Sequence, residues 1–281
     1  MPIDACQFFY TCSQCQEVLK PLPGDCCVFC SYSDSLCPSR QVAETQTSGS
    51  KPIMGEMVTF ESNGGTCNGY LAIPEISSGP AVIVIQEWWG LVGHITEVAD
   101  RFAAEGFVAL APDLYHGAIA KEPDHAMKLL MGLAMDKAAL DIDGASNYLG
   151  ERPEVVGKGV AAVGFCMGGS LALWSATLSS NVIATVAFYP GMPWARMAPV
   201  WANYSGKSAM IHCAESDGTS SASGIQEALK SIEAANGSVI AFDYPGTGHA
   251  FFNNDREEVY DAHAAKSSWA RTISFLREKI S

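Results

Sequence analysis

The sequence predicts a doubly wound α/β domain that follows a small cysteine-rich segment. Two observations carry this prediction. Short apolar runs of strand type alternate with helical segments over most of the chain, and seven of the ten cysteines fall before residue 38. Such alternation is typical of a mostly parallel sheet with helices on both faces. We therefore divide the chain into a cysteine-rich head (1–40), a linker (41–54) and an α/β domain (55–281).

Charge and hydropathy exclude several classes of partner. The chain has 281 residues, 48% of them hydrophobic, and a formal net charge of −13. This charge disfavours nucleic acid and anionic membrane surfaces. No apolar run approaches the ~20 residues of a membrane span, and the N-terminal residues lack the pattern of a signal peptide. We expect a cytoplasmic protein, either a monomer or a small homo-oligomer.

The head has the composition of a metal or redox module. Cys12-Ser13-Gln14-Cys15 has zinc-knuckle spacing, which lets two thiolates hold one tetrahedral ion. The other candidate ligands are Cys26, Cys27, Cys30 and Cys37. Residues 2–41 resemble small bacterial cysteine-rich proteins defined by a GDCCVxC run, so zinc is the expected ion. The alternative is an appendage of reduced cysteines that binds no metal.

The linker is polar, with small residues and no periodicity. The domain then begins with a hairpin signal, two strand-like runs around Asn63-Gly64-Gly65. Further strands are expected at 81–85, 107–111, 159–162, 182–189, 209–213 and 239–244. Helices are expected at 94–105, within 123–149, after the glycine-rich turn to 178, and at 223–235 and 259–278.

The glycine-rich turn Gly164-Phe165-Cys166-Met167-Gly168-Gly169 lies between a predicted strand and a predicted helix. This is the layout of a nucleophile elbow, with cysteine as the nucleophile. Glycines allow the sharp reversal, and the helix N-terminus favours a thiolate. A buried structural cysteine is the alternative. A phosphate-binding loop is disfavoured, because no Lys-Ser/Thr pair follows the glycines.

Partners for Cys166 are sought beyond the carboxyl ends of the other strands, where ligands bind in open α/β sheets. Asp217, or alternatively Glu215, follows one strand, and His249 follows the next. The order nucleophile, acid, histidine is that of α/β-hydrolases. The histidines that we do not assign to catalysis are His94, His116, His125, His212 and His263.

Residues 55–280 resemble the dienelactone hydrolase family of the α/β-hydrolase fold. The resemblance is carried by Gln86-Glu87-Trp88-Trp89-Gly90, Pro112-Asp113-Leu114-Tyr115, the Cys166 turn, Asp217 and Gly248-His249-Ala250-Phe251. It implies a Cys166–His249–Asp217 triad. It also implies that the Glu87 carboxylate hydrogen-bonds the resting thiol and accepts its proton when substrate arrives.

The chemistry expected of this set is acyl transfer through a thioester, with no cofactor for catalysis. Backbone N–H groups of Met167 and Trp88 are the expected oxyanion hole. Trp89, Tyr115, Phe251 and Asn253 are the candidate residues of the substrate pocket. Family members that act on dienelactones hold the substrate carboxylate with arginines, and Asn253 stands at one of those positions.

The substrate is therefore expected to be a small ester or lactone, and a dienelactone, a simple ester and a thioester all stay open. Two other interpretations also stay open. The chain could be a non-catalytic ligand-binding module linked to the metal or redox chemistry of the head. It could also be a relative of serine esterases with an altered nucleophile.

Overall fold

The computed structural model describes residues 10–11, 18–21, 28, 31, 54–191, 193–217 and 222–281. The chain divides into two compact units, Met1–Pro52 and Ile53–Ser281. In the first unit, β1 (Tyr10–Thr11) and β2 (Val18–Leu19) pair antiparallel. The predicted metal ligands Cys12, Cys15, Cys26, Cys27, Cys30 and Cys37 lie outside the described residues, as does the predicted linker up to residue 53.

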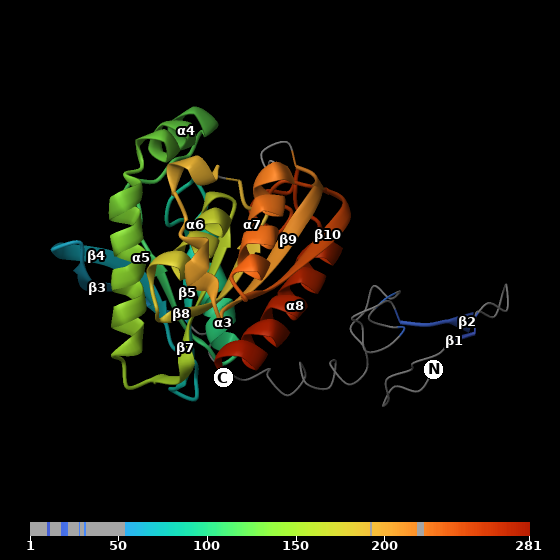
Figure 1. The fold of residues 1–281 in the computed structure, drawn as a ribbon, viewed down its shortest axis with the longest axis horizontal. Coiled ribbons are helices and arrows are strands. Elements are labelled where there is room, and N and C mark those ends of the chain that lie inside the picture. Colours follow the sequence, from blue (N-terminus) through green and yellow to red (C-terminus); the bar gives the residue numbers. More distant parts are fainter. Residues whose placement is uncertain are drawn as a thin grey trace. The chain divides into compact units, whose positions relative to one another are not determined.

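The second unit is built on an eight-stranded sheet with the order β10-β9-β8-β7-β5-β6-β4-β3 (Figure 1). The strands are β3 (Glu56–Ser62), β4 (Gly65–Ala72), β5 (Gly79–Ile85), β6 (Val108–Pro112), β7 (Val155–Phe165), β8 (Val182–Phe188), β9 (Ser208–Ser216) and β10 (Ser238–Gly248). The pairs β3–β4 and β4–β6 are antiparallel, and all the others are parallel. The predicted doubly wound, mostly parallel sheet is confirmed.

Helices cover both faces of this sheet (Figure 1). They are α3 (Gly93–Ala104), α5 (Met135–Gly150), α6 (Met167–Leu178), α7 (Ala222–Ala234) and α8 (Ala262–Ile280), whereas α4 (Pro123–Gly132) lies beyond one end of the sheet. Alternate residues of β5 show the division: Ile83 and Ile85 belong to the core cluster on the side of α5 and α6, whereas Val82 and Val84 belong to the cluster on the side of α3. A strand buried on both faces is expected to be apolar throughout, as β5 is.

The helical region expected within 123–149 is two helices, because Leu133 and Ala134 have extended backbones with ψ of 117° and 106°. The end of α4 is held by Arg196 in the short 3₁₀ turn Trp194–Arg196. The Arg196 guanidinium donates to the carbonyls of Leu130 at 3.1 Å and Leu133 at 3.4 Å. Helix ends leave such carbonyls without intrahelical partners, and Arg196 satisfies two of them here.

The strand order brings the candidate site residues together at one edge of the sheet. The chain adds β6 on one side of β5 and β7 on the other, so the loops after β5 and β7 flank a topological switch point, where ligands bind in such folds. These two loops contain Glu87 and Cys166. The neighbours β9 and β10 stay paired up to Ser216 and Gly248, which brings the next residues, Asp217 and His249, side by side.

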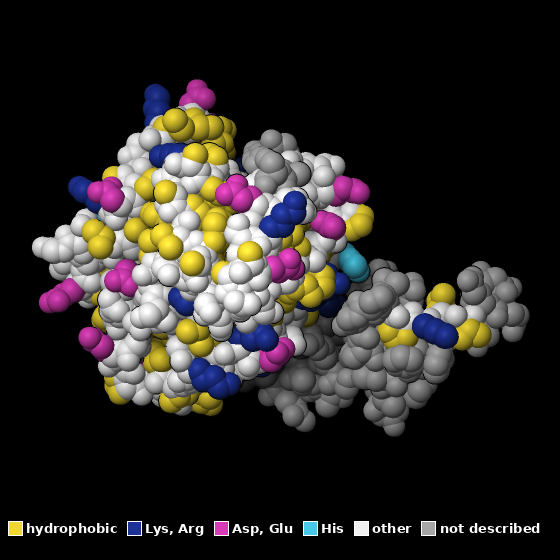
Figure 2. All heavy atoms as spheres, viewed as in Figure 1, with side chains coloured by type: hydrophobic (Ala, Val, Ile, Leu, Met, Phe, Trp, Pro, Cys, Tyr) yellow, Lys and Arg dark blue, Asp and Glu magenta, His cyan; other side chains and the backbone are white. Residues whose placement is uncertain are grey.

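The surface of the second unit mixes charges of both signs on the face shown in Figure 2, with hydrophobic side chains gathered over α4. Met127 and Met131 of α4 are exposed. In the described ranges, no helix combines the length and apolar character needed to cross a membrane.

Candidate active site

Cys166 occupies a strained turn between β7 and α6. Its φ of 54° and ψ of −118° are rarely adopted by a residue with a side chain. A Cβ at Gly164 would lie 1.9 Å from the Gly168 carbonyl oxygen, and one at Gly168 would lie 2.4 Å from the Gln86 carbonyl oxygen. The Cys166 N–H donates to the Phe188 carbonyl at 3.0 Å. The glycines therefore let the backbone close tightly enough to present Cys166 at the start of α6.

We expect Gly164→Ala to destabilise the fold by roughly 3–5 kcal/mol, because the clash is with backbone atoms that cannot rotate away. Gly93→Ala is the matched control, since a Cβ there would meet no atom within 4 Å. Urea unfolding of both variants measures the difference. A Gly164→Ala midpoint equal to that of Gly93→Ala would contradict this account of the elbow.

His249 and Asp217 lie against each other at the ends of β10 and β9. The His249 Nδ1 atom lies 2.7 Å from the Asp217 Oδ2 atom. The Asp217 side chain is 2% exposed and that of His249 is 23% exposed. The rival acid, Glu215, instead accepts from the Gly246 N–H at 2.8 Å. The structure thus brings Asp217, and not Glu215, against the imidazole.

The charge of His249 is set by its two partners. Burial alone lowers the pKa of the imidazole, but hydrogen bonds to Asp217 and Cys166, with the negative charges of both, outweigh burial and raise the pKa to about 10. A histidine with this pKa is protonated at neutral pH. It can therefore donate a proton to a leaving group, and it stabilises negative charge on the sulfur beside it.

The other described cysteines have the environment of structural thiols. Burial, with lesser contributions from nearby carboxylates, raises the pKa of Cys67 and of Cys213 to about 12 in each case. These thiols stay protonated at neutral pH, and the thiolate is the form that attacks carbonyls. Among the described cysteines, Cys166 is the one that faces the His249–Asp217 pair.

Glu87 is buried, 2% exposed, at the end of β5. Its carboxylate accepts from Asn253 Nδ2 at 2.7 Å and from the Tyr189 hydroxyl at 3.4 Å. Burial, with the negative charges of Glu87 and Cys166, raises the pKa of Tyr189 well above its ordinary value, so this phenol stays protonated and can donate to Glu87. In the described part of the chain, the side chains that donate hydrogen bonds to Glu87 are thus Asn253 and Tyr189.

Asn253→Leu should remove the shorter of these two hydrogen bonds and leave a buried carboxylate oxygen without that donor. We expect a loss of about 1–3 kcal/mol in the free energy of unfolding. Asn147→Leu, at an exposed asparagine of α5, is the control. Urea unfolding that shows equal stability for both variants would mean that Asn253 does not hold Glu87.

The expected oxyanion-hole residues lie on either side of the switch point. Met167 is the first residue of α6, so its N–H has no acceptor within the helix. Trp88 follows Glu87 and packs edge-on against Trp89, with ring centroids 5.1 Å apart. The Arg256 guanidinium lies over the Trp89 ring, 5.2 Å from its centroid.

Two of the four predicted pocket residues occupy different environments from those expected. Phe251 is fully buried and packs against Tyr189 and Tyr244, with centroids 5.2 Å and 4.9 Å away. The prediction that Phe251 lines the substrate pocket is therefore wrong. Its ring lies in the core and packs against these two aromatic residues. Asn253, 2% exposed, directs its amide to Glu87. Trp89 is partly buried near Arg256.

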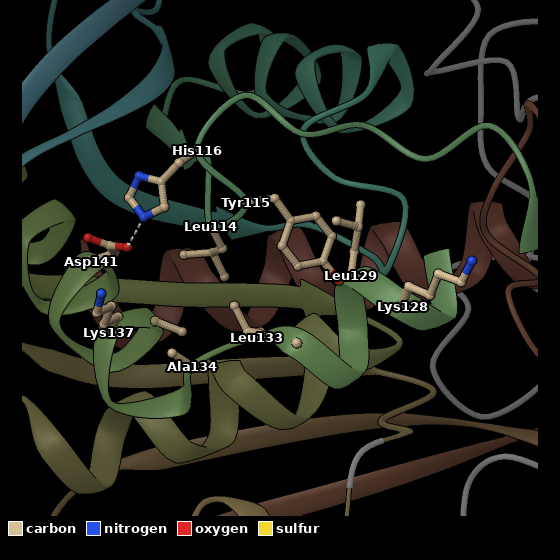
Figure 3. Close-up of a pocket in the computed structure, with 11 residues that line it drawn as sticks. Leu114, Tyr115, His116, Lys128, Leu129, Leu133, Ala134, Lys137 and Asp141 are labelled. Carbon is tan, nitrogen blue, oxygen red and sulfur yellow. Dashed lines mark ion pairs between the residues drawn. The ribbon is translucent and has the colours of Figure 1, made fainter. Parts of the chain in front are cut away.

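Tyr115 lies between the candidate site residues and a neighbouring cavity. Its hydroxyl donates to Met167 Sδ at 3.4 Å, and burial and the Cys166 charge raise its pKa well above the ordinary value. The ring also lines a cavity of about 290 Å³ bounded by α4 and α5 (Figure 3). Of the predicted site residues that the structure describes, this cavity contacts Tyr115 alone.

Sequence reasoning missed Tyr189. Besides its hydrogen bond to Glu87, its ring lies edge-on to the His249 imidazole, with centroids 5.1 Å apart. Its φ of 38° is unusual for an aromatic residue. Its position in the sequence could have indicated a role, because Tyr189 directly follows β8, just as the other site residues follow the carboxyl ends of their strands. Read alone, however, it resembles one more core aromatic.

Comparisons with known proteins agree on one family. Residues 67–280 match the model of the dienelactone hydrolase family. "Protein usf" of Aquifex pyrophilus is 38% identical over 234 residues, which is 81% of this chain and 100% of the relative. A protein of Aquifex aeolicus named "Putative carboxymethylenebutenolidase" is 35% identical over 231 residues, 80% of this chain and 98% of the relative.

A solved structure shares the fold at lower identity. It is a dienelactone hydrolase-like promiscuous phosphotriesterase from metagenomic libraries, with a TM-score of 0.71 and 24% identity. The match covers 82% of this chain and 100% of that one.

Proposed function

Because this chain belongs to the dienelactone hydrolase family and is a carboxylic ester hydrolase, we propose that it cleaves a small ester or lactone through a Cys166–His249–Asp217 triad and a thioester intermediate. The single observation that carries this proposal is the 2.7 Å contact between His249 Nδ1 and Asp217 Oδ2, with Cys166 interacting with the same imidazole. A base oriented by a carboxylate and placed against a nucleophile is the arrangement that acyl transfer requires.

In the acylation step, the Cys166 thiolate attacks the carbonyl carbon and forms a carbon–sulfur bond, while the carbonyl electron pair moves onto oxygen. N–H groups of Met167 and Trp88 hold this oxyanion. When the intermediate collapses, the carbon–oxygen bond to the alcohol breaks, and protonated His249 gives its proton to the departing oxygen. Asp217 keeps the imidazole oriented throughout.

In the deacylation step, neutral His249 takes a proton from water, and the hydroxide attacks the thioester carbonyl. The carbon–sulfur bond breaks, the acid product leaves, and the thiolate and protonated His249 are restored. Between cycles the sulfur is held as a thiol: Glu87 takes its proton when substrate arrives and returns it to the thiolate when the product has left. The position of Glu87 beside Tyr189, whose ring also lies edge-on to the His249 imidazole, supports this role.

The contacts around the site also bear on the charge of the substrate. The amide of Asn253 is neutral and is used on Glu87, so it offers no charge to a substrate carboxylate. Arg256 pairs with Glu258 at 2.5 Å and lies over Trp89. These contacts favour uncharged esters or lactones over substrates that need a dedicated arginine.

The test is steady-state hydrolysis of p-nitrophenyl acetate, a small uncharged lactone, and cis- and trans-dienelactone by the wild-type chain, with Cys166→Ala as the blank. We expect turnover of the uncharged substrates that exceeds the blank, with weaker turnover of the dienelactones. Preferred turnover of a dienelactone would overturn the substrate assignment and leave the triad. Wild-type rates equal to those of Cys166→Ala on every substrate would overturn the triad and favour a non-catalytic binding module.

A further inference from the structure

A second group of chemically active side chains lies on the far side of Tyr115. Cys67 of β4, His116 of the turn after β6, and Asp141 of α5 each offer one ligand atom, and these atoms all lie within 4.8 Å of one another. They come from three elements far apart in the sequence, and we assign none of them to hydrolysis. Thiolate, imidazole and carboxylate are together the ligand types that zinc takes in proteins. The Cys67 thiol is protonated in the metal-free protein, so binding would release its proton to solvent as the sulfur takes the cation in its place.

The contact between His116 and Asp141 is unusual for an ion pair. Their Nε2 and Oδ2 atoms are 3.0 Å apart (Figure 3), yet Oδ2 is buried and has no hydrogen-bond donor among the described residues. The two atoms are thus close without being aligned for a hydrogen bond. Neighbouring ligand atoms of one tetrahedral ion, with metal–ligand bonds of about 2.0–2.3 Å, lie about 3.3–3.8 Å apart, so the 3.0 Å contact would have to open by a few tenths of an ångström to admit the ion.

The folding of the surrounding chain holds each of the three side chains in place. Gly144, one turn after Asp141, lets α5 approach β3 closely, since a Cβ there would lie 2.7 Å from the Glu61 carbonyl oxygen. This approach lets the Ser62 hydroxyl donate to Asp141 Oδ1, which fixes the carboxylate. Such second contacts commonly orient metal ligands.

The turn that bears His116 is fixed in a similar way. His116 has a φ of 50°, and the Asp113 carboxylate accepts from the backbone N–H groups of Tyr115 and Gly117 on either side of it. Its side chain is 52% exposed, whereas Cys67 is 1% exposed. A second hydrolytic triad is therefore disfavoured, because a substrate could not reach the Cys67 sulfur.

We propose that Cys67, His116 and Asp141 bind one zinc-class divalent cation, with the fourth coordination position open to water from the cavity beside α5. His116 and Asp141 both line that cavity of about 290 Å³ (Figure 3). The buried Asp141 Oδ2 atom, which has no hydrogen-bond donor among the described residues, would then be bound to the cation. The cation would also tie the turn that carries Tyr115 to β4 and α5.

The test counts Co²⁺, a spectroscopic substitute for Zn²⁺, on the full-length reduced chain by equilibrium dialysis. Wild type is compared with His116→Ala, Asp141→Asn and the control His125→Ala, at an exposed histidine of α4. Because the head also contains cysteines, the measured quantity is the difference between variants. We expect His116→Ala and Asp141→Asn each to bind one equivalent fewer than wild type and His125→Ala, and to lose part of the thiolate-to-cobalt absorption.

Equal stoichiometry in wild type, His116→Ala and His125→Ala would overturn the proposal. We expect His116→Ala to fold, because the side chain that it removes is half exposed, so its result can be compared directly with wild type. The proposal does not depend on the hydrolase mechanism, since none of the three ligands belongs to the Cys166 triad.

Discussion

Asp217→Asn is expected to lower kcat/KM for p-nitrophenyl acetate by about 10²–10⁴-fold. The substitution keeps the shape of the side chain but removes the negative charge and the acceptor that face His249 Nδ1 at 2.7 Å. Without them, the imidazole is held less firmly in the productive orientation, and its protonated form loses its main stabilising partner.

The same variant should also change the pH profile in a defined direction. In wild type, His249 has a pKa raised to about 10, so its protonated form, and the activity that depends on it, should be lost as the pH rises through about 10. In Asp217→Asn the pKa falls, and the alkaline limb should move to lower pH. The measurement is kcat/KM from about pH 6 to about pH 11. An unchanged alkaline limb would show that Asp217 does not control this proton.

Cys166→Ser is expected to lower kcat/KM for the same ester by about 10²–10⁴-fold. A serine hydroxyl needs a neutral base to take its proton, whereas His249 is already protonated at neutral pH in the wild-type site. The sulfur, in contrast, can carry negative charge beside the imidazolium. A site tuned for a thiol therefore loses rate when oxygen replaces sulfur.

Cys213→Ser is the control for thiol replacement, because the pKa of Cys213 is raised to about 12 by burial and nearby carboxylates, and we give it no part in the reaction. It should retain activity within about twofold. If Cys166→Ser hydrolyses the ester faster than wild type does, the site is that of a serine esterase with an altered nucleophile.

The sequence predicted the sheet well because its strands carry a strong local signal. The run Ala81–Ile85 is apolar on both faces and is one strand, β5, covered by helices on both sides. The division between α4 and α5 was not predicted, because neither Leu133 nor Ala134 is a strong helix breaker. That break depends on tertiary contacts such as those that Arg196 makes with the last turn of α4.

For the site, strand ends and chain order were enough to select Cys166, His249 and Asp217 as candidates. They could not choose between Asp217 and Glu215, since this depends on which carboxylate faces the ring after β9 and β10 pair. Nor could they show that Asn253 holds Glu87, or that Phe251 is buried. These are properties of side-chain packing between distant segments, and periodicity carries no information about them.

The convergence of Cys67, His116 and Asp141 is the same kind of property. No spacing in the sequence links the three residues, because one lies on a strand, one in a turn and one on a helix. Only the close approach of α5 to the β3–β4 hairpin, which Gly144 allows, brings them together.

The central claim is that the reaction passes through an acyl group on the Cys166 sulfur. The most direct measurement is peptide mass spectrometry of enzyme quenched in acid during turnover of p-nitrophenyl acetate, with His249→Gln included to slow deacylation. We expect the mass of one acetyl group on the peptide that contains Cys166, removable by hydroxylamine and absent from Cys166→Ala. Acetyl found on another residue, or on no residue while ester is consumed, would contradict this claim.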